Sequence, residues 1–271
     1  MARAGGENFP VASRLLPRRE RAHLLAIYGF ARLVDELGDT LGGDRLAALD
    51  WLEGELDLAF AGRAQHPLLV ALAPTLRECG LAREPFARLI EANRLDQRVR
   101  RYETWEQLRR YCSLSADPVG QLVLEVFGAA SEATVALSDS ICTALQLAEH
   151  CQDVAEDLDA GRVYLPLEDL ERYGCSVSQL QAPHAGPQVR AVVAFEVVRA
   201  RALLAQGLPL LGLLHGRARL GVAGFIAGGR AALRAIERAG YDVLAGPPSV
   251  TRTGALLELA GTLGAAWRGG S

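Results

Sequence analysis

The chain contains no lysine, so arginine supplies all 29 of its basic residues. The 32 acidic residues leave a formal net charge of −3. A domain that binds nucleic acid usually carries a strong basic excess, so this balance argues against such a partner. The absence of lysine is typical of codon bias in a GC-rich genome, and recognition through guanidinium groups is the alternative interpretation.

Segments that would carry the chain into a membrane are also missing. The first residues lack the apolar core of a signal peptide. The longest apolar stretch, at 203–214, is interrupted by Gln206, Gly207 and Pro209 and falls short of the roughly 20 residues that span a bilayer. The five cysteines form no closely spaced pair, which indicates buried free thiols in a reducing compartment. We therefore predict a cytoplasmic protein with at most a peripheral contact with a membrane.

Strand signals are nearly absent, whereas apolar residues recur at intervals of three and four along most of the chain. Half of the 271 residues are hydrophobic, which is enough to build a sizeable core. No internal repeat is present, and no stretch is a convincing linker between domains. The sequence predicts one all-α domain over residues 1–271. Its expected helices are 18–41, 44–61, 67–79, 83–98, 104–127, 132–159, 189–213, 218–239 and a weaker one at 250–267.

The first informative pattern lies in the predicted helix 18–41. Tyr28, Ala31 and Asp35 fall on one line of its surface, and Asp39 follows one turn later. Asp35 would then extend the stripe that faces the core, where a carboxylate is costly unless a cation or hydrogen bonds compensate it. A solvated helix end is the alternative interpretation of this acidic pair.

The predicted helix 132–159 carries a second acidic face. Glu149, Asp153 and Asp157 follow one another at intervals of four, and His150 is the only base nearby. Like charges at this spacing repel by a few tenths of a kcal/mol per pair, so folding alone does not require the arrangement. Such a face favours a hard divalent cation, because Mg²⁺ binds carboxylate oxygens together with water and substrate phosphates.

We expect the two acidic faces to oppose each other across a helical bundle and to bind a divalent cation between them. A di-iron site is a weaker alternative, because it requires the Glu-x-x-His arrangement twice. Glu20 and His23 have that spacing, but the second acidic face offers no counterpart.

The segment after the second acidic face reads Gly161-Arg162-Val163-Tyr164-Leu165-Pro166. Glycine is expected to end the helix, so that Arg162 lies beside its acidic end. Arg162 either clamps a phosphate with two hydrogen bonds or pairs with Asp157 or Asp159. Tyr111 precedes a bend at residues 118–120 and taken alone is a packed aromatic residue with a satisfied hydroxyl.

In combination, these motifs resemble the squalene and phytoene synthase family, the head-to-head prenyl transferases, over nearly the whole chain. That family carries a D-x-x-x-D pattern on one helix, matched here by Asp35 and Asp39. Its second acidic pair follows a glutamine-containing helix and leads into D-x-x-G-R-x-Y-x-P. The matching residues are Gln146, Asp153, Asp157, Asp159, Gly161, Arg162, Tyr164 and Pro166.

The resemblance implies an isoprenoid-synthase helical bundle with a central cavity, an isoprenoid diphosphate substrate and Mg²⁺ as cofactor. Its implied metal ligands are Asp35, Asp39, Asp153 and Asp157. The implied residues at the diphosphate are Arg32, Glu149 and Arg162, and the implied catalytic residues are Tyr111 and Tyr164. A lipophilic product of such an enzyme is compatible with a peripheral membrane contact.

Finer matches point to one branch of the family, the bacterial hydroxysqualene synthases of hopanoid biosynthesis. They are the segments 7–17, 111–120 and 240–244. This branch implies conversion of presqualene diphosphate and water into hydroxysqualene and diphosphate without NADPH. The chain also lacks a strand followed by G-x-G-x-x-G, the usual nicotinamide signature.

Two other functions stay open at this point. One is a transferase that joins farnesyl diphosphates into presqualene diphosphate, or geranylgeranyl diphosphates into phytoene. The other is a non-catalytic family member that acts in assembly or lipid binding, which loss of a motif aspartate would favour; all four are present.

Three positions depart from the family pattern. Glu149 replaces an asparagine, and an ionised glutamate cannot donate a hydrogen bond to phosphate as an asparagine can. Asp117 replaces another asparagine of this branch, and Gly229 stands where many phytoene and squalene synthases have a tyrosine. The chain also begins a few residues before Glu7, without the upstream helix of relatives, and a misassigned start codon is one interpretation.

Overall fold

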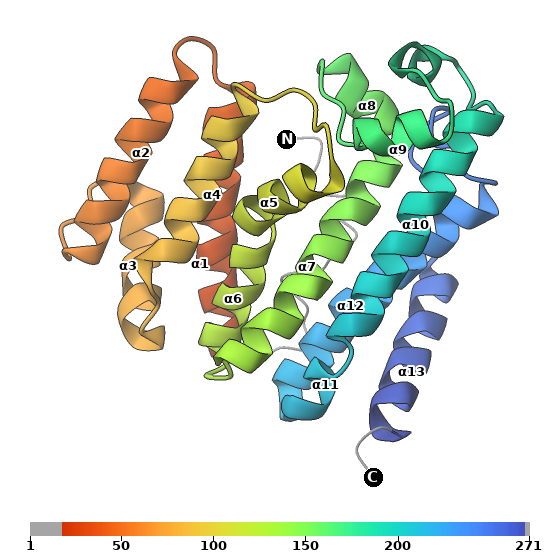
Figure 1. Cartoon of the computed structure of the whole chain (residues 1–271). Helices are drawn as coiled ribbons and strands as arrows, with labels where there is room; N and C mark the ends of the chain where they lie inside the picture. The colour runs from red at the N-terminus through yellow and green to blue at the C-terminus, as the bar shows by residue number, and fades with distance from the viewer. Residues whose placement is uncertain (1–17, 269–271) are drawn as a thin grey trace. The chain divides into compact units, whose positions relative to one another are not determined.

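A computed structural model describes residues 18–268 of the chain (Figure 1). Within this range the backbone forms helices and no strand, and its one extended pairing is an isolated bridge between Arg101 and Val163. The all-α prediction is therefore confirmed. No helix of the described part has the length and apolar character needed to cross a membrane.

The contacts between residues gather into two compact units. The N-terminal unit consists of residues 18–99 and 113–139, and the C-terminal unit consists of residues 100–112 and 140–268. Helices α5 (Trp105–Ser115) and α7 (Glu132–Gln152) contribute residues to both units. Since compact packing does not establish independent folding, the single domain stays a prediction.

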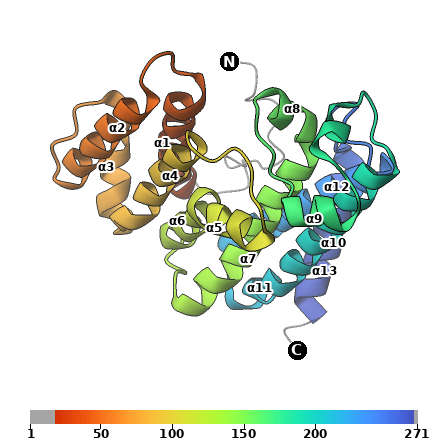
Figure 2. The same ribbon diagram turned by 45° about the horizontal axis from the view of Figure 1, so that its top comes forward.

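The N-terminal unit is built around α1, which packs against four other helical elements of this unit. Phe30 and Phe86 meet edge to face with ring centroids 5.1 Å apart, in a core completed by leucines such as Leu52. Helices α2 and α3 lie side by side in Figures 1 and 2. The elements of the N-terminal unit are α1 (Arg18–Asp35), the π-helix η1 (Glu36–Thr40), α2 (Arg45–Phe60), α3 (Pro67–Cys79), α4 (Arg83–Asp96) and α6 (Asp117–Val126).

The C-terminal unit is organised by α12, which packs against α10, α11 and α13 (Figure 2). Arg230 donates a 3.0 Å hydrogen bond to the Thr262 hydroxyl, and Arg234 pairs with Glu258 at 2.8 Å, so polar contacts join α12 to α13. Besides parts of α5 and α7, its elements are α8 (Val154–Asp159), α9 (Leu167–Arg172), the 3₁₀ helix η2 (Val177–Gln181), α10 (Pro187–Gly207), α11 (Leu210–Leu213), α12 (Gly216–Arg238) and α13 (Arg252–Arg268).

Four predicted helices are interrupted or change type. The segment 104–127 breaks at Ala116, because Pro118 lacks an N–H and is tolerated only in the first turn of a new helix. The segment 189–213 breaks before Pro209 for the same reason. The segment 132–159 breaks at Asp153, and the end of 18–41 is a π-helix. The short elements α9 and η2 were not predicted, because a periodic pattern needs a longer segment.

All five cysteines are free thiols. Cys112, Cys151 and Cys175 are buried, as predicted, whereas Cys79 and Cys142 are only partly buried. Burial raises the pKa of the Cys151 thiol well above its ordinary value, so this thiol is held in the unreactive neutral form.

The π-helix η1 is held from two sides within the N-terminal unit. The Gln97 side chain donates a 3.0 Å hydrogen bond to the Gly38 carbonyl, and Arg45 donates one of 2.9 Å to the carbonyl of Asp39. Gly38 is buried against the Asn93 side chain, which a Cβ at this position would overlap. π-helical turns are rare and frequently found at functional sites. This one carries Asp39.

Gly38→Ala is expected to lower the free energy of unfolding by about 1–3 kcal/mol, because overpacking at a buried site forces its neighbours to shift. Gly54→Ala is the matched control, since a Cβ on this exposed helical glycine meets nothing within 4 Å. The control should stabilise the protein by about 0.5–1 kcal/mol through helix propensity. Urea unfolding of both variants measures the difference, and equal stabilities would contradict the close packing at Gly38.

Candidate active site

The second acidic motif lies where α7 passes into α8. Asp153 separates the two helices with φ −100° and ψ 16°, so the prediction of one continuous helix is wrong at this residue. The backbone spacing nevertheless persists, because the Asp153 N–H donates to the Glu149 carbonyl at 2.9 Å and the Asp157 N–H donates to the Asp153 carbonyl at 2.8 Å. The three acidic residues therefore still follow one another turn by turn, and all three are partly buried.

The chain turns sharply after α8 and then pairs with a distant segment. Gly161 adopts the left-handed φ of 76°, which ends the helix as predicted, and the Arg162 N–H donates to the Asp157 carbonyl at 2.8 Å. The Val163 N–H then donates to the Arg100 carbonyl at 2.9 Å. Four residues later, the Leu167 N–H donates to the carbonyl of Tyr102, also at 2.9 Å. This pairing brings Tyr164 beside Tyr102.

Four buried rings form an aromatic stack, defined as Tyr102, Tyr111, His150 and Tyr164. The His150 and Tyr164 rings are nearly parallel, at 11°, with centroids 3.9 Å apart. Tyr102 stacks on Tyr164 with centroids 5.8 Å apart and an interplanar angle of 22°. Tyr111 lies 5.4 Å from Tyr102 and 5.5 Å from Tyr164. The stack presents electron-rich faces of the kind that attract cations.

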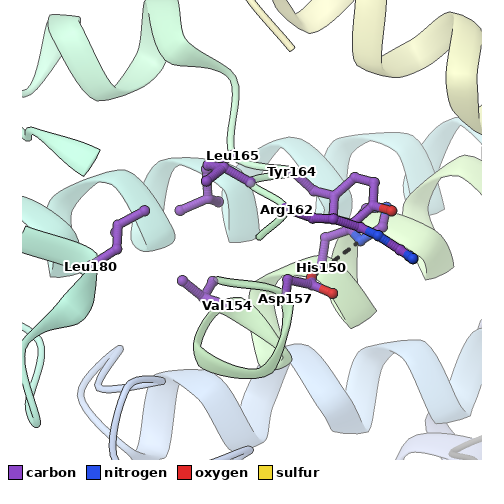
Figure 3. A pocket seen from close by; sticks show the side chains of 8 residues that line it. His150, Val154, Asp157, Arg162, Tyr164, Leu165 and Leu180 are labelled. Carbon is purple, nitrogen blue, oxygen red and sulfur yellow. Dashed lines mark ion pairs between the residues drawn. The ribbon is translucent and has the colours of Figure 1, made fainter. Parts of the chain in front are cut away.

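A cavity opens between this stack and the second acidic motif, and Figure 3 shows its side chains. The Asp157 carboxylate lies 3.9 Å from Nδ1 of His150, and its side chain is 23% exposed. A carboxylate, a guanidinium and a tyrosine ring thus border one space, with apolar side chains completing the wall. The lining residues are His150, Val154, Asp157, Arg162, Val163, Tyr164, Leu165 and Leu180.

The first acidic motif belongs to the N-terminal unit. Arg32, Asp35 and Asp39 are all exposed, and the buried face of α1 instead includes Phe30 and Val34. The expectation that Asp35 extends the core-facing stripe is therefore wrong, because the buried face follows residues 27, 30 and 34. That the two acidic motifs oppose each other across a bundle stays a prediction.

The donor set of the second acidic motif fits Mg²⁺ better than a softer metal. In the described part of the chain, no group of three or more His, Cys, Asp or Glu side chains is placed to hold an ion alone. Mg²⁺ needs fewer protein ligands, because water and substrate phosphates complete its shell. The Asp157 carboxylate on the cavity wall is a ligand of the required type.

Two residues of the stack were not predicted as functional. The sequence identifies His150 only as a base near the acidic face, although it follows Gln146 by four residues, the spacing of neighbours on one helix face. Tyr102 gave no local signal, since it reaches Tyr164 only through the pairing of residues 100–103 with 163–168. The structure brings both together with the predicted residues Tyr111, Asp157 and Tyr164.

A larger residue at Gly229 would require the Leu145 side chain to shift. A Cβ on this buried glycine of α12 would overlap the Leu145 side chain from α7 and would lie 3.6 Å from Leu204 of α10. The space that a side chain at 229 would need is therefore filled by leucine.

A buried charged cluster occurs in the same unit, and none of its residues lines the cavity. Arg199 donates to Asp169 at 2.8 Å and to both carboxylate oxygens of Glu196 at 2.6 and 2.8 Å. The Arg199 guanidinium also stacks over the Trp105 ring, 4.6 Å from its centroid. Burial raises the pKa of Glu196 to about 8, with Asp169 adding to the effect and Arg199 opposing it.

A family model for squalene/phytoene synthases matches residues 2–254. The chain belongs to this family. The squalene/phytoene synthases are isoprenoid-synthesising enzymes that act on isoprenoid diphosphates. The resemblance inferred from the acidic motifs and the Gly161–Pro166 segment is thereby confirmed.

Individual relatives cover most of the chain. The hydroxysqualene synthase of Rhodopseudomonas palustris is 38% identical over 209 residues, which is 75% of this chain and 70% of that protein. The phytoene synthase of Thermus thermophilus is 35% identical over 243 residues, which is 89% and 83% of the two chains. The crystal structure of squalene synthase HpnC from Alicyclobacillus acidocaldarius is 49% identical, has a TM-score of 0.83 and covers 88% of this chain and 91% of that one. This likeness confirms the isoprenoid-synthase type of fold.

Proposed function

We propose that the chain converts presqualene diphosphate and water into hydroxysqualene and diphosphate, with Mg²⁺ bound through its acidic motifs. The observation that carries this proposal is the stacked pair of His150 and Tyr164 rings on the wall of a cavity that Asp157 and Arg162 also line. Ionisation of a prenyl diphosphate needs positive groups at the leaving group and an apolar, aromatic surface at the carbocation. The cavity combines both kinds of surface.

The choice of water as the nucleophile that captures the carbocation is supported by the relatives. The hydroxysqualene synthase of Rhodopseudomonas palustris is 38% identical to this chain over 75% of this chain's length. The segments 7–17, 111–120 and 240–244 resemble the same branch. We therefore assign the alcohol-forming reaction to this chain in preference to one that ends in a reduced hydrocarbon.

In the proposed reaction, the bond between the cyclopropylcarbinyl carbon and the diphosphate oxygen breaks, and its electron pair leaves with the diphosphate. The cyclopropane ring of the cation opens, water forms the new carbon–oxygen bond, and its extra proton passes to the departing diphosphate. No carbon is reduced overall, so the reaction balances without NADPH.

The chain's own side chains act on the two ends of the substrate. The Arg162 guanidinium donates hydrogen bonds to the diphosphate, with Arg32 and Glu149 assigned to the same group. The rings of Tyr111 and Tyr164 face the cation, and the apolar cavity wall excludes stray water. Asp35, Asp39, Asp153 and Asp157 are the proposed ligands of Mg²⁺, which when bound would supply positive charge to the leaving oxygen.

Incubation of the purified protein with presqualene diphosphate and Mg²⁺, without any nicotinamide, tests the proposal. We expect a C30 alcohol and diphosphate in equal amounts, identified by mass spectrometry and a diphosphate assay. EDTA should abolish turnover, and added Mg²⁺ should restore it. Squalene formed only after addition of NADPH would refute the proposed reaction, and turnover of no isoprenoid diphosphate would favour a non-catalytic role.

A head-to-head prenyltransferase is the second candidate function. It is favoured by the similarity to the phytoene synthase of Thermus thermophilus, which extends over 89% of this chain. The same assay with farnesyl diphosphate or geranylgeranyl diphosphate separates the candidates. Formation of presqualene diphosphate or phytoene as the end product would support the transferase.

Glu149→Asn is expected to retain or raise turnover of presqualene diphosphate. The substitution restores the family residue, and its amide can donate a hydrogen bond to phosphate where the carboxylate cannot. Steady-state kcat and KM measure the effect, with the neighbouring exposed Glu156→Gln as the control for removal of one negative charge. A loss of more than a hundredfold in Glu149→Asn alone would show that the glutamate has its own role.

A further inference from the structure

His150 contacts both the second acidic motif and the aromatic stack. It lies on α7, is buried, and stacks on Tyr164 with centroids 3.9 Å apart and an interplanar angle of 11°. Its Nδ1 lies 3.9 Å from the Asp157 carboxylate (Figure 3). Its Nε2 lies 3.3 Å from the amide nitrogen of Gln146, one turn earlier. Every polar atom of the ring thus faces a defined neighbour.

With the Gln146 amide oriented as it is in this structure, its contact with His150 corresponds to one tautomer of the neutral ring. An amide nitrogen can only donate, so Nε2 of His150 accepts the hydrogen bond. The proton then resides on Nδ1, which faces Asp157. A separation of 3.9 Å is too long for a direct hydrogen bond, so Nδ1–H attracts the Asp157 carboxylate electrostatically without occupying its oxygens.

We infer that His150 is a positioning residue, which attracts the Asp157 carboxylate electrostatically from Nδ1–H and holds the Tyr164 ring through stacking. The inference rests on the proposed function, because Asp157 is its assigned metal ligand and Tyr164 its assigned aromatic face. One rigid ring thereby favours one direction of a carboxylate and fixes the orientation of an aromatic face. Neighbours that hydrogen-bond to metal ligands typically contribute 10–100-fold to metal affinity or activity, and we expect this longer contact to act in the same direction.

Two substitutions separate the two contacts. His150→Phe keeps a flat ring for Tyr164 and removes Nδ1, whereas His150→Asn keeps an amide near the position of Nδ1 and removes the ring. The control is His23→Phe, which removes another buried histidine, whose Nδ1 lies 2.9 Å from the Thr75 hydroxyl in the N-terminal unit. The measurements are the Kd of Mn²⁺ with inorganic diphosphate, the near-ultraviolet circular dichroism of tyrosine, kcat and KM.

For His150→Phe we expect the Mn²⁺ Kd to rise about tenfold or more and kcat to fall by a similar factor, while the tyrosine dichroism is kept. For His150→Asn we expect the Mn²⁺ Kd to stay within about threefold of the wild type, while the dichroism weakens and kcat falls. The control should leave the Mn²⁺ Kd and kcat unchanged.

Equal losses in both His150 variants, accompanied by equal falls in melting temperature, would reduce His150 to a packing residue and overturn the inference. Mn²⁺ affinity and kcat unchanged in His150→Phe would overturn it as well. Failure of the proposed function is distinguishable, because the wild type would then not convert presqualene diphosphate. The opposite patterns of Mn²⁺ affinity and dichroism in the two variants would still be observed.

Discussion

Replacing Asp157 by asparagine is expected to lower kcat/KM for presqualene diphosphate by about a thousandfold, because the charge that we propose to bind Mg²⁺ at the leaving group is lost. The Asp157 side chain lines the cavity and lies 3.9 Å from Nδ1 of His150. Asparagine keeps the size of the side chain and removes its charge, so the backbone hydrogen bond from Arg162 to the carbonyl of residue 157 should persist. Steady-state kinetics at saturating Mg²⁺ measures the loss.

Asp159→Asn is the matched control for this substitution. It makes the same chemical change two residues later, on an exposed side chain that does not line the cavity. Its kcat/KM should stay within about threefold of the wild type, since exposed charges interact weakly. Similar losses in the two variants would show that general negative charge, rather than the Asp157 carboxylate, supports the reaction.

The stability of the protein is expected to fall as pH rises from about 4.5 to about 8. Glu196 is fully buried beside Asp169 and Arg199, and burial raises its pKa from the ordinary value of 4.5 to about 8. Between these values the native state holds a proton that the unfolded chain has released, so the native state binds more protons and each pH unit destabilises it. The total effect is on the order of 5 kcal/mol.

Urea unfolding at pH 5.5, 7 and 8.5 measures this dependence. The charged groups that face Glu196 are Asp169 and Arg199, and the neutral Cys151 thiol is the other titratable group beside it. Arg172 pairs with Asp169 from α9 at 3.2 Å. Glu196→Gln keeps the shape of the side chain and cannot ionise, so its stability should change much less with pH than that of the wild type. Parallel curves for the two proteins would contradict the raised pKa of Glu196.

The helices were predictable where a periodic segment is bounded by residues that strongly favour a helix start or a helix end. The prediction 67–79 coincides with α3, because Pro67 suits the first helical turn and Gly80 ends the helix with a left-handed φ of 62°. The break at Asp153 has no such marker, since neither glycine nor proline occurs there. The π-helix was not predictable either, because the side-chain hydrogen bonds to its carbonyls come from Gln97 and Arg45, which lie outside the helix.

The candidate site was predictable as far as local spacing determines it. Asp157, Arg162 and Tyr164 lie within eight residues, so a short turn must bring them to one place, and all three line the cavity. Tyr102 could not be predicted, because its place in the stack depends on hydrogen bonds between segments some 60 residues apart, such as that from Leu167. A pairing of this kind produces no recognisable pattern in the sequence of either segment taken alone.

The close approach of Leu145 to Gly229 couples two positions that are 84 residues apart (229 − 145) on different helices. A tyrosine at 229 requires the Leu145 side chain to move or to be replaced, because a Cβ at 229 would overlap its terminal methyl group. The order of the changes matters. A smaller residue at 145 first leaves a tolerable void, whereas tyrosine first creates an overlap. Homologous sequences should therefore show covariation, with a small residue at position 145 wherever an aromatic residue occupies position 229.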